Sequence, residues 1–192
     1  MTGLRNIVSG LVAAGLCAVA MWLWEMRIDV QVDLLNPLRT YGRIGEVVKN
    51  DTFSVRVDRY DVGGSITRRF GTSGAHRTDG VFLYVQLRAM GETEPYTMGH
   101  ARLETRDGLT YDEGARVGVL TDASETYQPM LWGKGTLLFE LPKDQLAGAR
   151  VVVGTKDLLN GLSAESVIDL GIDDAKAAQL TGRALPNIEL GS

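Results

Sequence analysis

Apolar and polar residues alternate with a period of two along most of this chain, a pattern that predicts β-strands. In the clearest stretch, Phe53, Val55 and Val57 occupy one face and polar residues occupy the other. The alternation changes parity after Arg59, which predicts either a β-bulge in that strand or a strand that switches sheets. Similar patterns predict further strands at residues 46–49, 81–90, 100–105, 109–111, 136–141, 150–153 and 166–170.

The strand predicted at residues 81–90 differs from the others, because its first five residues are apolar on both faces. Such a strand is typical of the centre of a sheet. The other strands have one apolar face each, and a long connection at residues 112–130 is expected to cross from one sheet to another. The sequence therefore predicts an all-β fold, an immunoglobulin-like β-sandwich.

Glycine and aspartate residues mark the expected turns. The glycines at 63–64 are expected to end the second strand, and residues 65–80 are expected to form a polar loop that closes at a turn at 79–80. The sequence Arg-Asp-Gly at 106–108 predicts a hairpin turn.

One short helix is expected near the C-terminus. Asp173 has the side chain of an N-cap, residues 175–180 are good helix formers, and Gly182 is a typical stop. The last ten residues are expected to be frayed.

The N-terminal stretch at residues 7–24 breaks this pattern, because it is apolar almost throughout and carries no charge. As a helix it would be about 27 Å long, close to the hydrocarbon thickness of a bilayer. It predicts a single transmembrane anchor, with Trp22 and Trp24 at the membrane interface. The alternative is a signal peptide cleaved after Ala20, since Ala-Val-Ala at 18–20 fits a cleavage site.

The anchor determines the expected topology and the division of the chain. Arg5 precedes the apolar stretch and acidic residues follow it, which favours a cytoplasmic N-terminus and an extracytoplasmic remainder at the cell membrane. We therefore expect a cytoplasmic N-terminus at 1–6, the anchor at 7–24, a stalk or linker at 25–40, the sandwich at 41–172, and a short helix and tail at 173–192.

Composition narrows the possible partners. The formal net charge is −4, and a nucleic-acid partner would require clustered positive charge. The one cysteine, Cys17, lies in the apolar stretch, so the exported domain has no internal disulfide. We expect no nucleic acid and no small-molecule cofactor as a partner.

The reactive residue types do not form a recognisable catalytic or metal-binding motif. His76 and His100 have no spacing that pairs them with each other or with a cysteine. Acidic residues cluster at 107–113 and at 169–174, where they are expected to form solvated turns and a helix cap; calcium binding stays open. The sequence predicts no catalytic residues, no metal site and no enzyme activity.

A basic group is the candidate contact surface. Arg68, Arg69, His76 and Arg77 fall in the predicted loop at 65–80, where they could contact an anionic partner or simply keep the loop soluble. Trp132 is a second candidate, either as an exposed anchor for a partner or as a cap on the core.

Four stretches resemble the telokin-like, immunoglobulin-like domain family of unknown function, whose members are often secreted or membrane-anchored in bacteria. They are GEVVKNDTFSVRVDRYDV at 45–62, DGVFLYVQLRA at 79–89, LETRDGLTYD at 103–112 and GTLLFELPKD at 135–144. The resemblance covers about residues 41–170 and implies an opening strand pair, a central strand, a hairpin and a late strand. It implies no catalytic residues.

The sequence thus predicts a non-catalytic, membrane-anchored extracytoplasmic protein. Its expected role is that of a protein-binding or accessory subunit of a membrane complex, with a membrane or extracytoplasmic protein as its partner. The alternative is a cell-wall or polymer-binding module that acts as an independent domain.

Overall fold

The structure is a computed structural model that describes residues 15–22, 24, 37–68, 75–114, 126–155, 163–182 and 186–190. The chain divides into two compact units, residues 1–36 and residues 37–192. In the first unit, residues 15–22 and 24 are helical and exposed. Among the described residues, no helix has the length and apolar character needed to cross a membrane. The rest of the predicted anchor, and residues 25–36 of the predicted stalk, lie outside the described residues.

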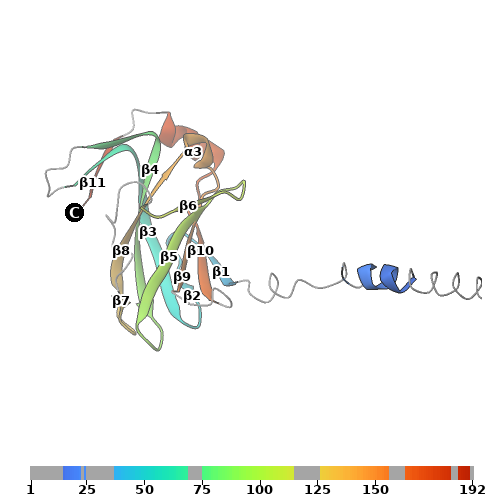
Figure 1. The fold of residues 1–192 in the computed structure, drawn as a ribbon. Helices are drawn as coiled ribbons and strands as arrows, with labels where there is room; N and C mark the ends of the chain where they lie inside the picture. The colour runs from blue at the N-terminus through green and yellow to red at the C-terminus, as the bar shows by residue number, and fades with distance from the viewer. Residues whose placement is uncertain are drawn as a thin grey trace, which may run out of the picture. The chain divides into compact units, whose positions relative to one another are not determined.

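The second unit is a sandwich of two β-sheets (Figure 1). Sheet A contains β1 (Leu38–Arg43), β10 (Ala164–Asp169), β9 (Arg150–Thr155), β5 (Tyr96–Glu104) and β6 (Thr110–Asp112), in this order, with β7 (Thr126–Tyr127) paired to β5. Sheet B contains β11 (Asn187–Leu190), β3 (Phe53–Arg68), β4 (His76–Gly91) and β8 (Gly133–Leu141), in this order, with β2 (Val48–Lys49) paired to β3. A short 3₁₀ turn, η1 (Lys143–Gln145), and one helix, α3 (Asp174–Thr181), complete the described elements.

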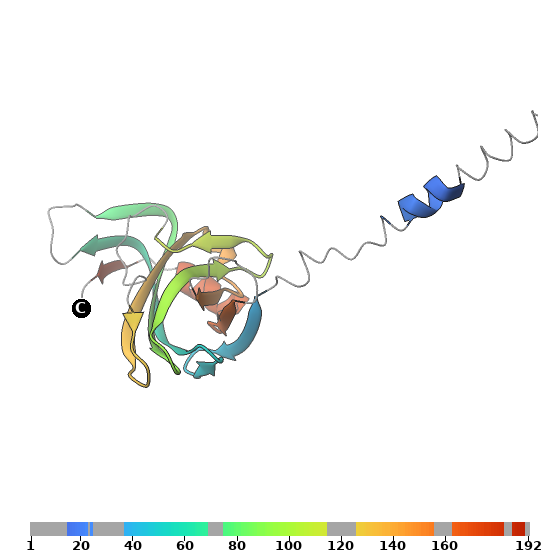
Figure 2. The same cartoon turned by 60° about the horizontal axis from the view of Figure 1, so that its bottom comes forward.

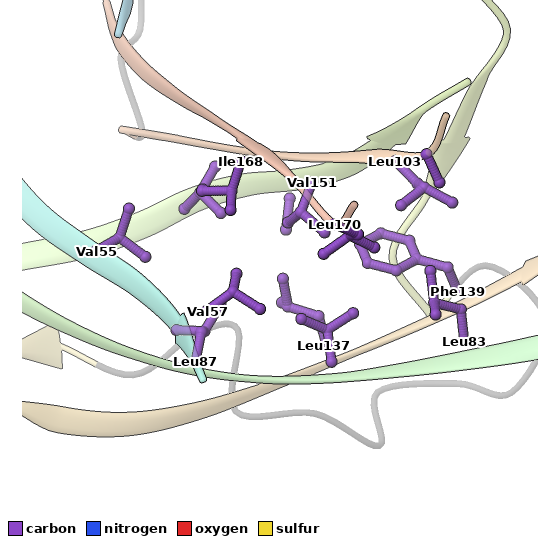
Figure 3. Close-up of a cluster of buried hydrophobic side chains, with 14 of the residues drawn as sticks. Val55, Val57, Leu83, Leu87, Leu103, Leu137, Phe139, Val151, Ile168 and Leu170 are labelled. Carbon is purple, nitrogen blue, oxygen red and sulfur yellow. The ribbon is translucent and has the colours of Figure 1, made fainter. Parts of the chain in front are cut away.

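The main core fills the space between the two sheets. Figure 3 shows Val57, Leu87 and Leu137 of sheet B facing Leu103 and Val151 of sheet A. All five side chains are buried, and Figure 2 shows the strands curving around this shared interior. The alternating residues of the predicted strands thus form the inner faces of a β-sandwich, as the sequence predicts.

A second, smaller cluster lies on the opposite face of sheet B. It consists of Ile66, Phe82, Tyr84, Leu138 and Ile188, all buried. Phe82 and Tyr84 therefore point away from the main core, while their neighbours in β4 point into it. This second cluster explains why the central strand is apolar on both faces.

The described part of the predicted polar loop at 65–80 is mostly strand, and residues 69–74 lie outside the described residues. β3 continues past Gly63 and Gly64 to Arg68, and β4 begins at His76, so the two form a long antiparallel pair. The two glycines lie at a register shift rather than at the end of the strand, because the burial of Ile66 in the outer cluster favours further pairing. The expected turn at residues 79–80 is likewise part of β4.

The ends of the domain also differ from the prediction. Residues 38–40, expected in the linker, belong to β1, which pairs in parallel with β10. Residues 187–190, expected in a frayed tail, form β11, which pairs in parallel with β3. Ile188 lies so close to Gly63 that a Cβ at Gly63 would be 2.6 Å from Ile188 Cγ1. The C-terminal strand is therefore packed onto the sandwich.

Three local predictions are confirmed. The register shift between Val57 and Arg59 is the predicted bulge. The turn at 106–108 joins the antiparallel strands β5 and β6. The carboxylate of Asp173 accepts a hydrogen bond from the backbone N–H of Lys176 at 2.7 Å, as an N-cap does. Of the long connection at 112–130, residues 115–125 lie outside the described residues.

Ile188→Ala should lower the free energy of unfolding by about 2 to 4 kcal/mol, because it removes a buried side chain from the outer cluster. Urea denaturation measures this loss. The neighbouring exposed variant Glu189→Ala is the control and should change stability by less than about 0.5 kcal/mol. Equal, small effects of both variants would show that β11 is not packed as described.

Candidate functional site

A groove lies where the edge strands of the two sheets meet. β6 is the last strand of sheet A and β8 the last strand of sheet B in the sheet order, and the backbone N–H of Gly114, just after β6, donates to the carbonyl of Leu138 in β8 at 2.9 Å. Beside this contact is a groove of about 530 Å³, a size typical of ligand sites. Its described lining consists of Thr78, Asp79, Gly80, Phe82, Tyr111, Asp112, Gly114, Leu138, Glu140, Leu141, Pro142 and Lys143.

The groove has apolar side chains from both clusters. Phe82 and Leu138 come from the outer cluster, and Leu141 comes from the main core. At Gly80 a Cβ would lie 2.3 Å from the carbonyl oxygen of Leu141, so the backbones of β4 and β8 approach too closely there for a side chain. These residues give the groove an apolar surface formed by strands that are distant in sequence.

Acidic side chains line the same groove. Asp79 and Asp112 are exposed, and Glu140 is half-buried. Thr78 Oγ1 donates a hydrogen bond to Glu140 Oε1 at 2.7 Å and accepts one from the backbone N–H of Gly80 at 3.0 Å. Lys143 is the one cationic residue among the described lining, so the groove carries an excess of negative charge at neutral pH.

Glu113 lies between two of the lining residues and adds to this acidic character. It is half-buried, and its Oε1 is buried without a hydrogen-bond partner within the described part of the chain. Burial raises the pKa of the Glu113 carboxyl, because the charged form loses its water.

The chemistry of the groove suits binding. Its described lining contains hydroxyl and carboxylate groups but no histidine or cysteine that could act with them as a nucleophile and base. An apolar surface with a few polar groups is the usual composition of a site that holds a ligand. We therefore take the groove as the candidate functional site.

The second polar assembly is an ion-pair network on sheet A, and it includes His100. Its centre is Glu165, whose side chain is only 3% exposed. Glu165 accepts hydrogen bonds from Arg102 at 2.9 Å and Arg39 at 3.1 Å, and lies 3.0 Å from His100 Nε2. Both arginines also contact Glu104, at 2.8 Å from Arg39 and 3.3 Å from Arg102. The network links strands β1, β10 and β5.

Gly154 makes this network possible. β9 lies between β10 and β5, and Gly154 is opposite both Glu165 and His100 in the pairing register. A Cβ at Gly154 would be 2.2 Å from Cε1 of His100, so the imidazole reaches across β9 in the space that a side chain would fill. Packing against Gly154 and the contact with Glu165 therefore hold the His100 ring in place, which is a structural role.

The surroundings of Glu165 determine its protonation. Burial alone would raise its pKa, but hydrogen bonds from His100 and Arg102, together with the charges of Arg102 and Arg39, outweigh burial and lower the pKa to about 2. For Arg39, burial opposes the charged form, but hydrogen bonding and charge attraction from Glu104, with Glu165, raise its pKa. The carboxylate and the guanidinium groups therefore stabilise one another in their charged forms.

The predicted basic group is only partly described. His76 and Arg77 are exposed on β4, opposite Ile66 and Ser65 of β3. The backbone of Arg68 is at the end of β3, while its side chain and all of Arg69 lie outside the described residues. The contact surface predicted for these residues stays a prediction.

The predicted tryptophan sites are exposed. Trp132 is 37% exposed and follows Met130 and Leu131, which are 76% and 64% exposed. Trp132 belongs to neither buried cluster, and its two expected roles, as a cap on the core or as a contact residue, stay predictions. Trp22 and Trp24 are exposed on the N-terminal helix.

The two acidic clusters do not assemble into a metal site within the described residues, where no group of three or more possible ligands is found. Asp173 caps α3, and Asp174 forms an ion pair with Arg106 at 3.0 Å. Asp169 accepts a hydrogen bond from the backbone N–H of Gly171 at 2.8 Å. The histidines are also separate, since His76 is in sheet B and His100 in sheet A. The second cluster consists of turn and cap residues, as the sequence predicted.

The sequence does not predict the groove. In the sequence pattern, Asp112 belongs to the acidic cluster at 107–113 and Asp79 to the expected turn at 79–80. One signal was present: the apolar outer face of the strand at 81–85 required a covering or a ligand on that side of the sheet. The pattern could not indicate which other strands would meet there.

No protein-family model matches this chain, and no curated protein sequence matches it. The sandwich is similar to several solved structures. A secreted protein of Mycobacterium tuberculosis, MPT63, is 13% identical, with 69% of this chain and 97% of that chain covered and a TM-score of 0.46. The yjhA protein of Bacillus subtilis is 15% identical, with 66% and 99% covered and a TM-score of 0.47. An uncharacterized β-sandwich protein of Clostridium difficile is 10% identical, with 70% and 95% covered and a TM-score of 0.41.

Acidification should remove the stability that Glu165 contributes. Its pKa is about 2 in the folded protein and ordinarily 4.5, so the contribution is fully present above 4.5 and is lost as the pH falls towards 2. The loss should be on the order of 3 kcal/mol. Urea denaturation at a series of pH values measures it, and Glu165→Gln should remove this part of the pH dependence. Glu189→Gln is the control, and an equal pH dependence in both variants would contradict the assignment.

Gly154→Ala should lower the free energy of unfolding by about 1 to 3 kcal/mol, because the added methyl group displaces the His100 ring. In a His100→Ala background the same substitution should cost less, since the methyl group then has room. A double-mutant cycle by urea denaturation measures the difference. Gly154 does not have a positive φ, so an equal cost in both backgrounds would point to a clash other than the one with His100.

Proposed function

We propose that this chain is a non-catalytic binding protein that acts outside the cytoplasm as an accessory subunit of a membrane complex. The observation that carries the proposal is the groove between β6 and β8, which combines buried apolar residues with an acidic lining. In the proposed role, the partner is a membrane or extracytoplasmic protein that docks there. The basic group and Trp132 are proposed as secondary contacts.

The proposal includes a single N-terminal membrane anchor at residues 7–24. Its support is the uncharged apolar sequence, the two tryptophans at 22 and 24, and the charge difference across the stretch. The proposed orientation places the N-terminus in the cytoplasm and the sandwich outside. We also propose that the sandwich is a member of the telokin-like, immunoglobulin-like domain family, because four stretches of the sequence resemble that family.

Purification of the full chain from native membranes in a mild detergent should recover a stoichiometric companion protein. The double variant Asp79→Lys/Asp112→Lys should lose most of that companion, because it reverses the charge at two exposed positions of the groove. Quantitative mass spectrometry of the purified material measures the ratio. Deletion of residues 1–24 should release the chain from the membrane fraction.

Asp51→Lys is the matched control, because Asp51 is exposed and does not line the groove. It lies just before Phe53, which pairs with Gly91 at the end of β4 remote from Asp79. A chain that purifies alone, or a companion retained equally by the groove variant and the control, contradicts the proposal. Retention of the isolated domain on cell-wall material would instead favour a polymer-binding module.

A further inference from the structure

We infer that the groove binds an extended peptide segment of the partner in which a lysine or arginine follows an aliphatic residue. This inference rests on the proposed function and specifies the chemistry of the partner at the same site. It is supported by the run of lining residues along β4 and β8, by the apolar surface, and by the carboxylates of Asp79 and Asp112, which have no partner within the described residues.

The residues that line the groove follow two neighbouring strands. Its lining follows β4 from Thr78 to Phe82 and the end of β8 from Leu138 to Leu141, continuing to Lys143. At about 3.3 Å per residue, the β4 portion alone is about 13 Å long. This length matches about four residues of extended polypeptide, and the side chains of such a segment alternate between two faces.

The apolar surface suits one face of that segment. Phe82, Leu138 and Leu141 are buried, with Tyr111 half-buried and Pro142 exposed beside them. Tyr111 and Pro142 offer the accessible part of this surface. An aliphatic side chain that packs against it removes its own apolar surface from water, which favours binding. Leu138 already uses its carbonyl to accept the N–H of Gly114, so we expect binding through side chains more than through backbone pairing to β8.

The charge suits a basic residue on the other face. The side chains of Asp79 and Asp112 form no hydrogen bond or ion pair with any part of the chain that the structure describes, whereas Asp58 is paired with Arg56 and Arg88. Lys143 is the one cationic residue in the described lining, so it can neutralise at most one of these two carboxylates. A bound cation would therefore meet two exposed carboxylates that have no competing partner in the described parts of the chain, and its attraction should weaken as salt is added.

Two acetylated and amidated peptides test the inference, Leu-Lys-Leu-Lys-Leu and its charge-reversed form Leu-Glu-Leu-Glu-Leu. Each is titrated by calorimetry into the full chain in phosphatidylcholine nanodiscs, with empty nanodiscs as the blank. We expect the lysine peptide to bind at least about tenfold more tightly than the glutamate peptide, and more weakly at high salt.

Asp79→Lys/Asp112→Lys should abolish or reverse this preference, and Asp51→Lys should leave it unchanged. Circular dichroism and urea denaturation establish that each variant is folded. Equal affinity for both peptides, a preference that survives in the groove variant, or no binding of either peptide would overturn the inference. If the groove variant still loses its companion in native membranes while neither peptide binds, the peptide chemistry is wrong and the proposed function stands. If the companion is retained, the docking role of the groove itself is wrong.

Discussion

The antiparallel pairing of β3 with β4 is the contact on which the rest of the domain depends. Both strands have 16 residues, and their inner faces supply about a third of the buried residues of the main core. The outer face of the same pair carries Ile66, Phe82 and Tyr84, which would be exposed if the sheet had nothing against that side. Ile188 of the C-terminal strand covers part of it, and this requirement explains why the tail is packed rather than frayed.

The outer faces of the two sheets are stabilised by different kinds of contact. Sheet B uses a small apolar cluster, whereas sheet A uses the network around Glu165, in which charges of opposite sign are closely paired. A buried carboxylate is tolerated there because two guanidinium groups and an imidazole satisfy it. Gly154 contributes by its missing side chain, so the network depends on one small residue as much as on the charged ones.

The acidic residues of the groove differ from those of the Glu165 network in their pairing. The charges around Glu165 satisfy one another, while Asp79 and Asp112 at the groove have no partner within the described residues. The groove also lies where two edge strands meet, a position at which a sandwich leaves backbone and side chains accessible. A site that joins apolar surface to unpaired charge at a sheet edge is suited to recognise another chain, and this is the basis of the proposed function.

The strands with one buried face, the bulge before Arg59, the hairpin at 106–108 and the cap at Asp173 can be predicted from the sequence, because they depend on neighbouring residues and on local backbone geometry. The sequence also indicates that residues 81–85 are buried on both sides. Three features depend on contacts between distant segments: residues 65–68 and 76–80 pair as strands, residues 187–190 join sheet B, and Gly154 leaves room for His100. The groove belongs to this second group, since Asp79, Asp112 and Glu140 are far apart in the chain and share one surface only after β4, β6 and β8 have come together. No pattern with a period of two can show which strands will be neighbours.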